Sequence, residues 1–330
     1  MDRRSFLSIL SSTPFLLSNF QKPREYKADI AIIGGGTGGV ACALSALGHG
    51  AKVILTEETD WLGGQFTSQG VPPDENPWVE TFGSTKRYKE FRNAIREYYK
   101  RNYPLKDEHK NNPYLNPGNG NVSRLCHEPK VSAIVINSLL SHYETMDKTS
   151  KPQLRIMKKH KPTKVITKGD KIQAVCLLDL DHGEELWVQA EYFVDATETG
   201  ELLHLGKVEY VTGMESKKDT GEPHASSTGE PKAMQACTWC FAMEYIPGAD
   251  FSISKPQNYE FWKSFIPKLE PPWPGPLFSF TTSHPVTLEP RTLPLDPEGN
   301  EPKSWWRYRQ ILDKTLFDSP TIKSSITLVN

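Results

Sequence analysis

A glycine-rich turn between two apolar segments constrains the fold of this 330-residue chain more than any other feature. Residues 28–33, ADIAII, predict a short buried strand that leads directly into GGGTGG, residues 34–39. In the pattern Gly-x-Gly-x-x-Gly, the first glycine permits a tight turn, the second lets the backbone approach a diphosphate, and the third lets the next helix pack on the strand. Free N–H groups at a helix start bind such an anion. The sequence therefore predicts a dinucleotide-binding turn.

The residues after this turn complete the expected unit. Residues 40–47 predict a helix that ends at Gly48 and Gly50, and residues 52–56 predict a second strand. Glu57 closes that strand about 20 residues after the middle glycine, the offset at which an acid accepts hydrogen bonds from an adenosine ribose. Strand, turn, helix, strand and acid occur in the order that a Rossmann-type site requires. The alternative is a structural glycine loop.

Two later features favour FAD over a nicotinamide dinucleotide as the cofactor. Gly63-Gly64-Gln65 is a second turn with exposed backbone, where a simple nicotinamide dehydrogenase would continue into another strand–helix repeat. A β-meander is predicted further on, with strands at residues 154–156, 164–167, 172–180 and 186–190. Residues 192–194 predict one more buried strand, which ends in a turn at 195–200. A return from a meander to the first sheet is typical of glutathione-reductase-like flavoproteins.

The chain resembles the bacterial FAD-dependent oxidoreductases grouped with the FAD-binding subunit of heterodisulfide reductase. The stretches that carry this resemblance are residues 32–75, 116–129, 192–203, 211–216 and 221–225. The resemblance implies an α/β fold with a glutathione-reductase-like FAD-binding Rossmann domain, a β-meander insertion and a discontinuous substrate domain. The FAD contacts that it implies are Gly34, Gly36, Thr37, Gly38, Gly39, Glu57, Gly63, Gly64, Gln65, Val165, Ala196, Thr197 and Gly200. Val165 is placed after the third strand, where the backbone meets adenine.

The segment RLCHE, residues 124–128, is the candidate for chemistry beside the flavin, and a helix is predicted after it at 130–142. In the functional interpretation His127 is a general base and Arg124 binds an anionic group of the substrate. In the structural interpretation Arg124 forms an ion pair, Cys126 is a small buried group and the segment begins the helix. Flavin carries the redox chemistry itself, so few protein groups are required.

Cys237 and Cys240 form a Cys-x-x-Cys pair with three interpretations. They are a redox-active dithiol that exchanges electrons with the flavin, a structural disulfide or buried pair, or ligands of an iron–sulfur cluster. A cluster needs four cysteines, and the other three show no matching spacing, so the clusters of heterodisulfide reductase are not expected here. Histidines lack the spacing of a zinc site. No metal is expected.

The chain divides into three expected parts. Residues 1–26 combine Arg3 and Arg4 with an apolar stretch, which predicts a twin-arginine-like export signal and a periplasmic location, with an amphipathic helix as the alternative. Residues 27–212 form the FAD-binding domain, with an inserted loop and helix region at about 71–121.

That inserted region carries a helix predicted at 86–100. Residues 213–330 form a proline-rich substrate domain with a helix at 303–316. The final apolar strand at 325–330 stops without a turn, which predicts that the domain is incomplete and the chain is part of a longer protein.

The charge and hydropathy of the chain exclude some classes of function. A net charge of −1 argues against nucleic-acid binding, and beyond the N-terminus no apolar run reaches the roughly 18 residues of a membrane span. We expect hydride transfer from a small organic substrate to FAD, with an electron acceptor that the sequence does not identify. The alternatives are a thiol–disulfide flavoenzyme that uses the Cys-x-x-Cys pair, and a non-catalytic FAD-binding protein.

Overall fold

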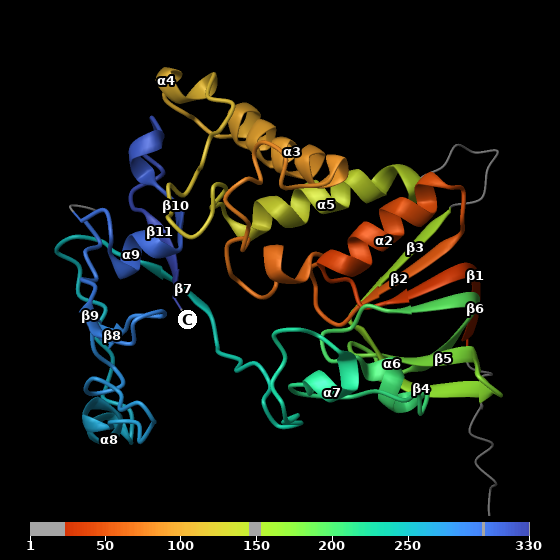
Figure 1. Ribbon diagram of the computed structural model, residues 1–330. Helices are drawn as coiled ribbons and strands as arrows, with labels where there is room; N and C mark the ends of the chain where they lie inside the picture. The colour runs from red at the N-terminus through yellow and green to blue at the C-terminus, as the bar shows by residue number, and fades with distance from the viewer. Residues whose placement is uncertain (1–23, 145–152, 299–300, 330) are drawn as a thin grey trace, which may run out of the picture.

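The computed structural model describes residues 24–144, 153–298 and 301–329. A six-stranded mixed sheet in the order β3-β2-β1-β6-β5-β4 dominates it (Figure 1). The strands are β1 (Arg24–Ile33), β2 (Val53–Glu57), β3 (Leu154–Lys158), β4 (His160–Lys168), β5 (Lys171–Asp179) and β6 (Glu185–Asp195). The helices of this part are α2 (Thr37–Gly48), the 3-10 turn η1 (Gly64–Phe66), α3 (Lys86–Asn102), α4 (Asp107–Lys110), α5 (Pro129–Glu144), α6 (Glu201–Leu205) and α7 (Lys217–Thr220). The expected α/β fold with a Rossmann-type sheet is confirmed.

Two cores lie on opposite faces of this sheet, because successive strand residues point to opposite sides. Ile32 of β1 packs with residues of α2, α3 and α5, the helices that Figure 1 shows above the sheet. Its neighbours Ala31 and Ile33 face the other way and pack with the meander residues Val175 and Val188. The predicted helices at 86–100 and 130–142 are α3 and α5, so the helical periodicity was interpreted correctly.

The meander differs from the prediction in two respects. Residues 154–156 belong to β3, which pairs in parallel with β2 as the outer strand of the Rossmann sheet. Residues 186–190 and 192–194 are a single strand, β6, which runs antiparallel to β5 at one edge and parallel to β1 at the other. The meander is therefore β4-β5-β6, and its last strand is also part of the dinucleotide-binding sheet.

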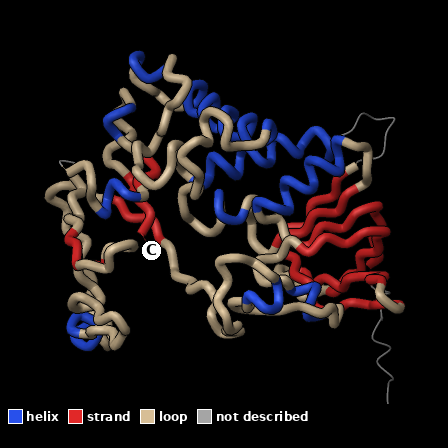
Figure 2. The backbone as a smooth tube through the Cα atoms, in the orientation of Figure 1, coloured by secondary structure: helices blue, strands red, loops and turns tan. Residues whose placement is uncertain are grey.

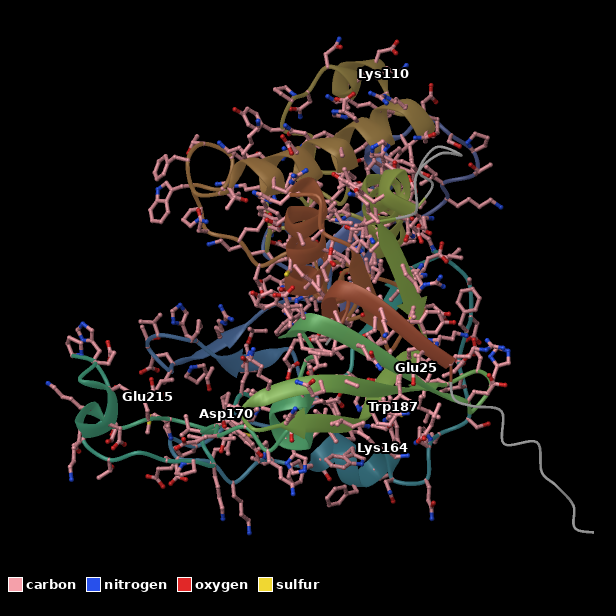
Figure 3. The ribbon with its side chains drawn as sticks, turned by 90° about the vertical axis from the view of Figure 1, so that its right-hand side faces the viewer. Glu25, Lys110, Lys164, Asp170, Trp187 and Glu215 are labelled. Atoms are coloured by element: carbon pink, nitrogen blue, oxygen red, sulfur yellow. The ribbon has the colours of Figure 1, made fainter. Side chains whose placement is uncertain are left out.

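The first strand begins earlier than expected. Arg24 pairs with Leu186, and Glu25 with Trp187; the last two residues are labelled in Figure 3. Residues 24–26, which were expected to belong to the export signal, are thus part of β1. The segment that carries the expected export signal, up to residue 23, lies outside the described residues.

The second half of the chain is mostly loop (Figure 2). Its elements are β7 (Phe241–Glu244), α8 (Tyr259–Ser264), β8 (Thr281–Ser283), β9 (Pro290–Thr292), α9 (Trp305–Tyr308), β10 (Gln310–Leu312), the 3-10 turn η2 (Lys314–Leu316) and β11 (Ile326–Val329). The expected terminal strand is β11, the central strand of a small sheet ordered β10-β11-β7. The helix predicted at 303–316 is wrong. Ser304 caps only the single turn of α9, and Gln310 then pairs with Thr327.

The inserted region and the end of the chain pack together. The amide of Gln310 donates to the carbonyl of Gly118 at 2.8 Å, and the amide of Asn119 donates to the carboxylate of Asp313 at 3.0 Å. The N–H of Asp313 donates to the carbonyl of Pro117 at 3.0 Å. Segments nearly two hundred residues apart thus form one unit beside the sheet. Within the described ranges, no helix has the length and apolar character needed to cross a membrane.

Candidate functional site

A pocket of about 350 Å³ opens at the carboxyl ends of β1, β2 and β6. In open α/β sheets ligands bind at this edge. The residues that line it are Gly34, Gly35, Gly36, Thr56, Glu57, Glu58, Thr59, Ser68, Gln69, His160, Pro162, Ala196, Thr197, Glu198, Thr199 and Glu201. They come from the glycine turn after β1, the end of β2, the start of β4 and the turn after β6.

The glycine turn after β1 is packed too tightly for side chains. Gly34 has φ +104°, and a Cβ there would lie 2.1 Å from the carbonyl oxygen of Ala196. A Cβ on Gly39 would lie 2.0 Å from the carbonyl oxygen of Gly34. No side chain caps the N-terminus of α2 at Gly36, so its first N–H groups are open to an anion. The turn therefore has the shape and polarity of a diphosphate cradle.

Glu57 is buried at the pocket wall, with 8% of its surface exposed. Its Oε2 accepts from the N–H of Gly35 at 3.1 Å, and its Oε1 accepts from the N–H and hydroxyl of Thr59 at 2.8 and 2.7 Å. The hydroxyl of Thr56 accepts from the N–H of Gly34 at 3.1 Å. These bonds fix the carboxylate beside the glycine turn, where it retains lone pairs for ribose hydroxyls. Gly35, Thr56 and Thr59, which make these bonds, were not singled out in the sequence.

The second glycine turn is bonded to the first. The N–H of Gly63 donates to the carbonyl of Gly35 at 2.8 Å, and the hydroxyl of Thr37 donates to the carbonyl of Gly63 at 3.0 Å. Gly63 and Gly64 both have positive φ, +118° and +52°, which only glycine adopts readily. The Gln65 amide points away and lies 3.5 Å from Asp74. Ser68 and Gln69, which the sequence did not single out, line the pocket instead.

The turn after β6 is the third wall of the pocket. The N–H of Ala196 donates to the carbonyl of Ile33 at 2.7 Å, which locks this turn to the end of β1. Ala196 and Thr197 line the pocket, as expected. Gly200, with φ +69°, lies just behind them as the N-cap of α6. Ala196 and Thr197 therefore face the same space as the glycine cradle.

Val165 is not placed as expected. The third parallel strand, β3, ends at Lys158, and Lys159 turns the chain with φ +56°. Val165 lies further on, inside β4. It pairs with Val175 and packs against the core that contains Ala31 and Ile33. His160 and Pro162 line the pocket in its place. The error arose because β3 was taken as part of the meander, which moved the expected turn several residues along the chain.

Arg124 and His127 are not brought together. Arg124 is exposed, whereas His127 is buried in the core, with 3% of its surface exposed. The His127 ring contacts the carbonyl of Leu125 at 2.9 Å and the hydroxyl of Ser132 at 2.5 Å. Burial lowers the pKa of His127 to about 4. His127 therefore lies in the core as a neutral residue away from the pocket, and its interpretation as a general base is wrong. Arg124 is exposed and does not line this pocket.

The Cys-x-x-Cys pair forms no disulfide. Cys237 is exposed and Cys240 is half-buried, so the pair is not buried either. The Cβ of Cys240 lies 3.7 Å from the position that a Cβ would take on Gly70, in the loop that follows the pocket residue Gln69. Throughout the described part of the chain, no group of three or more His, Cys, Asp or Glu side chains could hold a metal ion.

The residues around the pocket fit the polar groups of a dinucleotide. The glycine cradle at the α2 N-terminus suits the diphosphate, and Glu57 suits the adenosine ribose. The turn at Gly63 and Gly64 is hydrogen-bonded to this cradle. Among the described residues that line the pocket there is no lysine or arginine. Backbone N–H groups and the helix dipole therefore provide the attraction for phosphate.

The chain is similar to several known proteins over part of its length. Glutathione reductase of Schizosaccharomyces pombe is 46% identical over 50 residues, which are 15% of this chain and 11% of that protein. L-proline dehydrogenase from P. horikoshii is 19% identical, with a TM-score of 0.29 over 53% of this chain and 23% of that chain. Glycerol-3-phosphate dehydrogenase from Bacillus halodurans, complexed with FAD, is 14% identical, with a TM-score of 0.32 over 52% and 34% of the two chains. The chain thus spans about a third or less of each relative.

A family model covers far more of the chain than any of these single relatives. The model described as FAD dependent oxidoreductase matches residues 29–319. That range begins in β1, includes all three turns of the pocket and extends into the small second sheet. The chain belongs to the FAD-dependent oxidoreductase family.

Proposed function

We propose that this protein oxidises a small organic substrate by hydride transfer to FAD held in the pocket at the end of the sheet. The observation that carries the proposal is the convergence of the three turns, after β1, β2 and β6, around one pocket with Glu57 in its wall. FAD supplies the hydride-accepting chemistry when it is bound. The electron acceptor and the substrate are to be found by screening.

The protein residues in this proposal bind and orient the cofactor. The open N–H groups of α2 hold the diphosphate, and the Glu57 carboxylate accepts from the ribose hydroxyls. The Gly63–Gly64 backbone, which is hydrogen-bonded to the first glycine turn, would hold the part of the cofactor that leads to the flavin. His127 has no role in moving a substrate proton, because both of its ring nitrogens are engaged in the core.

The purified protein should be yellow, with the absorption spectrum of an oxidised flavin, and the Gly36→Val variant should be colourless. A side chain at Gly36 projects into the cradle, toward the Glu198 carboxylate 3.0 Å from its Cβ position. Gly48→Ala is the control, because a Cβ on Gly48 meets nothing within 4 Å. Anaerobic photoreduction and a screen of alcohols, amines, sugars and quinones then identify the reductant and the acceptor. A colourless wild-type protein that binds NAD would contradict the proposal.

The position of Cys240 favours a second candidate function, thiol–disulfide exchange with the flavin. Its Cβ contacts the Gly70 position next to the pocket loop, and Cys237 is exposed to a dithiol substrate. If this is correct, Cys237→Ser and Cys240→Ser each abolish turnover with a disulfide or dithiol substrate and leave the flavin spectrum intact. The replacement of the buried Cys176 by Ser is the matched control. Unchanged turnover in both single variants removes this candidate.

We also propose that the protein is an exported bacterial flavoprotein of the subgroup that resembles the FAD-binding subunit of heterodisulfide reductase. Arg3, Arg4 and the apolar stretch after them support export. Cell fractionation should recover the protein outside the cytoplasm, and replacement of both arginines by Lys should retain it inside. Equal distribution of the two forms would argue against a twin-arginine signal.

A further inference from the structure

The turn after β6 places one carboxylate directly over the glycine cradle. Glu198 follows Thr197, whose N–H and hydroxyl both donate to Asp195, at 3.0 and 2.7 Å. The hydroxyl of Thr197 in turn accepts from the N–H of Glu201 at 2.8 Å. These bonds fix the backbone on both sides of Glu198. The position of the Glu198 backbone beside the cradle is therefore built into the fold, whereas its side chain stays free to rotate.

The Glu198 carboxylate lies in the notch between the first and second glycine turns. Its Oε1 is 3.0 Å from the position that a Cβ would take on Gly36 and 3.2 Å from that position on Gly64. Within residues 24–144, 153–298 and 301–329, no hydrogen bond or ion pair holds the carboxylate there, and the side chain is exposed. We call this space the glycine notch. A dinucleotide whose diphosphate sits on the α2 N-terminus needs the same space.

The other charges of the pocket do not neutralise Glu198. Glu57, Glu58 and Glu201 line the same pocket, and its described lining contains no lysine or arginine. Burial raises the pKa of Glu201, and the charge of Glu58 raises it further. Glu57 is tied to backbone N–H groups, as described above. Glu198 is thus the lining carboxylate that faces the diphosphate position without a partner of its own.

We propose that Glu198 determines the affinity for FAD by competing with its diphosphate for the glycine notch, and that its side chain rotates away when the dinucleotide binds. The inference rests on the placement of FAD in this pocket. Two like charges a few ångströms apart at a protein surface repel appreciably, and the repulsion weakens with added salt. The carboxylate therefore weakens FAD binding at low ionic strength, and the protein exchanges its cofactor more readily than the glycine cradle alone would allow.

The test is the dissociation constant of FAD for the full-length protein after removal of its flavin, measured by titration of flavin fluorescence. Glu198→Gln keeps the size of the side chain and removes its charge, so we expect it to bind FAD about fivefold to tenfold more tightly at low salt. Glu198→Ala, which also empties the notch, should bind at least as tightly. At about 1 M salt the wild-type and Gln variants should converge, because the Debye length falls to about 3 Å.

Glu191→Gln is the matched control, since Glu191 is exposed on β6 and does not line the pocket. Its affinity should equal that of the wild type. Equal or weaker FAD binding by both Glu198 variants overturns the inference, because the carboxylate then either has no effect or accepts a hydrogen bond from the cofactor. Gly36→Val separates this outcome from failure of the site itself. If Gly36→Val abolishes binding, the pocket assignment stands and only the role of Glu198 is lost, whereas unchanged binding removes both.

Discussion

Replacement of Arg92 by Met is expected to lower the free energy of unfolding by about 3 to 5 kcal/mol, because it leaves the buried carboxylate of Glu75 without its cation. Arg92 lies on α3 and is 1% exposed. Its guanidinium pairs with Glu75 and with Glu80, and Glu80 is shared with Arg96 of the same helix. Burial and the neighbouring charge of Arg96 lower the pKa of Arg92 to about 10, and the guanidinium still carries its charge at neutral pH.

The network extends beyond these ion pairs. Glu75 also accepts from the hydroxyl of Tyr88 at 2.5 Å and from that of Ser123 at 2.7 Å. It therefore joins the loop before α3 to the loop before α5, across the inserted region. Loss of Arg92 leaves the buried Glu75 carboxylate charged and without a cation. The free energy of unfolding therefore falls by more than the contribution of one hydrogen bond.

Urea denaturation of the flavin-loaded protein measures this effect. Arg87→Met is the control on the same helix, because Arg87 has 55% of its side chain exposed and only a 3.9 Å pair with Glu90. We expect that variant to change stability by less than about 1 kcal/mol. Arg92→Met combined with Glu75→Gln should recover part of the loss, since the second change removes the unpaired charge. A cost for Arg92→Met no larger than that for Arg87→Met would contradict the description of this network.

Local sequence determined the centre of the site well. The turn at Gly34, Gly36 and Gly39 was recognised from the spacing of its glycines, and at Gly34 and Gly39 steric exclusion leaves glycine as the residue that fits. Glu57 was found because its distance from the turn follows from the length of one helix and one strand. Ala196 and Thr197 were located by the strand before them. These predictions depend on distances along the chain that the fold keeps nearly constant.

The sequence predictions failed where the structure of a segment depends on strand pairing or side-chain contacts with another part of the chain. β3 has the same local pattern as a meander strand, and only its pairing with β2 places it in the Rossmann sheet. The helix predicted at 303–316 gave way to β10 because Gln310 and Leu312 pair with β11. Arg92 is buried beside the apolar residues Phe91 and Ile95 of α3, and its acidic partners are in a loop whose position the helix pattern does not predict. The position of Glu198 likewise depends on two turns that meet only in the folded chain.

Stability should depend on pH through His127, for which a general base was one of two interpretations of the sequence. The ring is neutral in the folded protein, where burial lowers its pKa from 6.5 to about 4. In the unfolded chain the ring takes up a proton below about pH 6.5. The unfolded state therefore binds the extra proton, so the stabilising contribution is complete above pH 6.5 and is lost as the pH falls toward 4. The difference corresponds to roughly 3 kcal/mol.

Denaturation curves between pH 7 and pH 4, recorded with saturating FAD, test this expectation. His127→Gln should be less stable than the wild type at pH 7, because it loses the fit between Leu125 and Ser132, but its stability should fall less steeply with acid. His142→Gln is the matched control, since His142 is exposed near the end of α5, the helix that carries Ser132. It should follow the wild-type slope. If the stability of the wild type and that of His127→Gln fall equally steeply with acid, the folded protein takes up a proton at His127 as readily as the unfolded chain does. His127 would then again be a candidate acid or base.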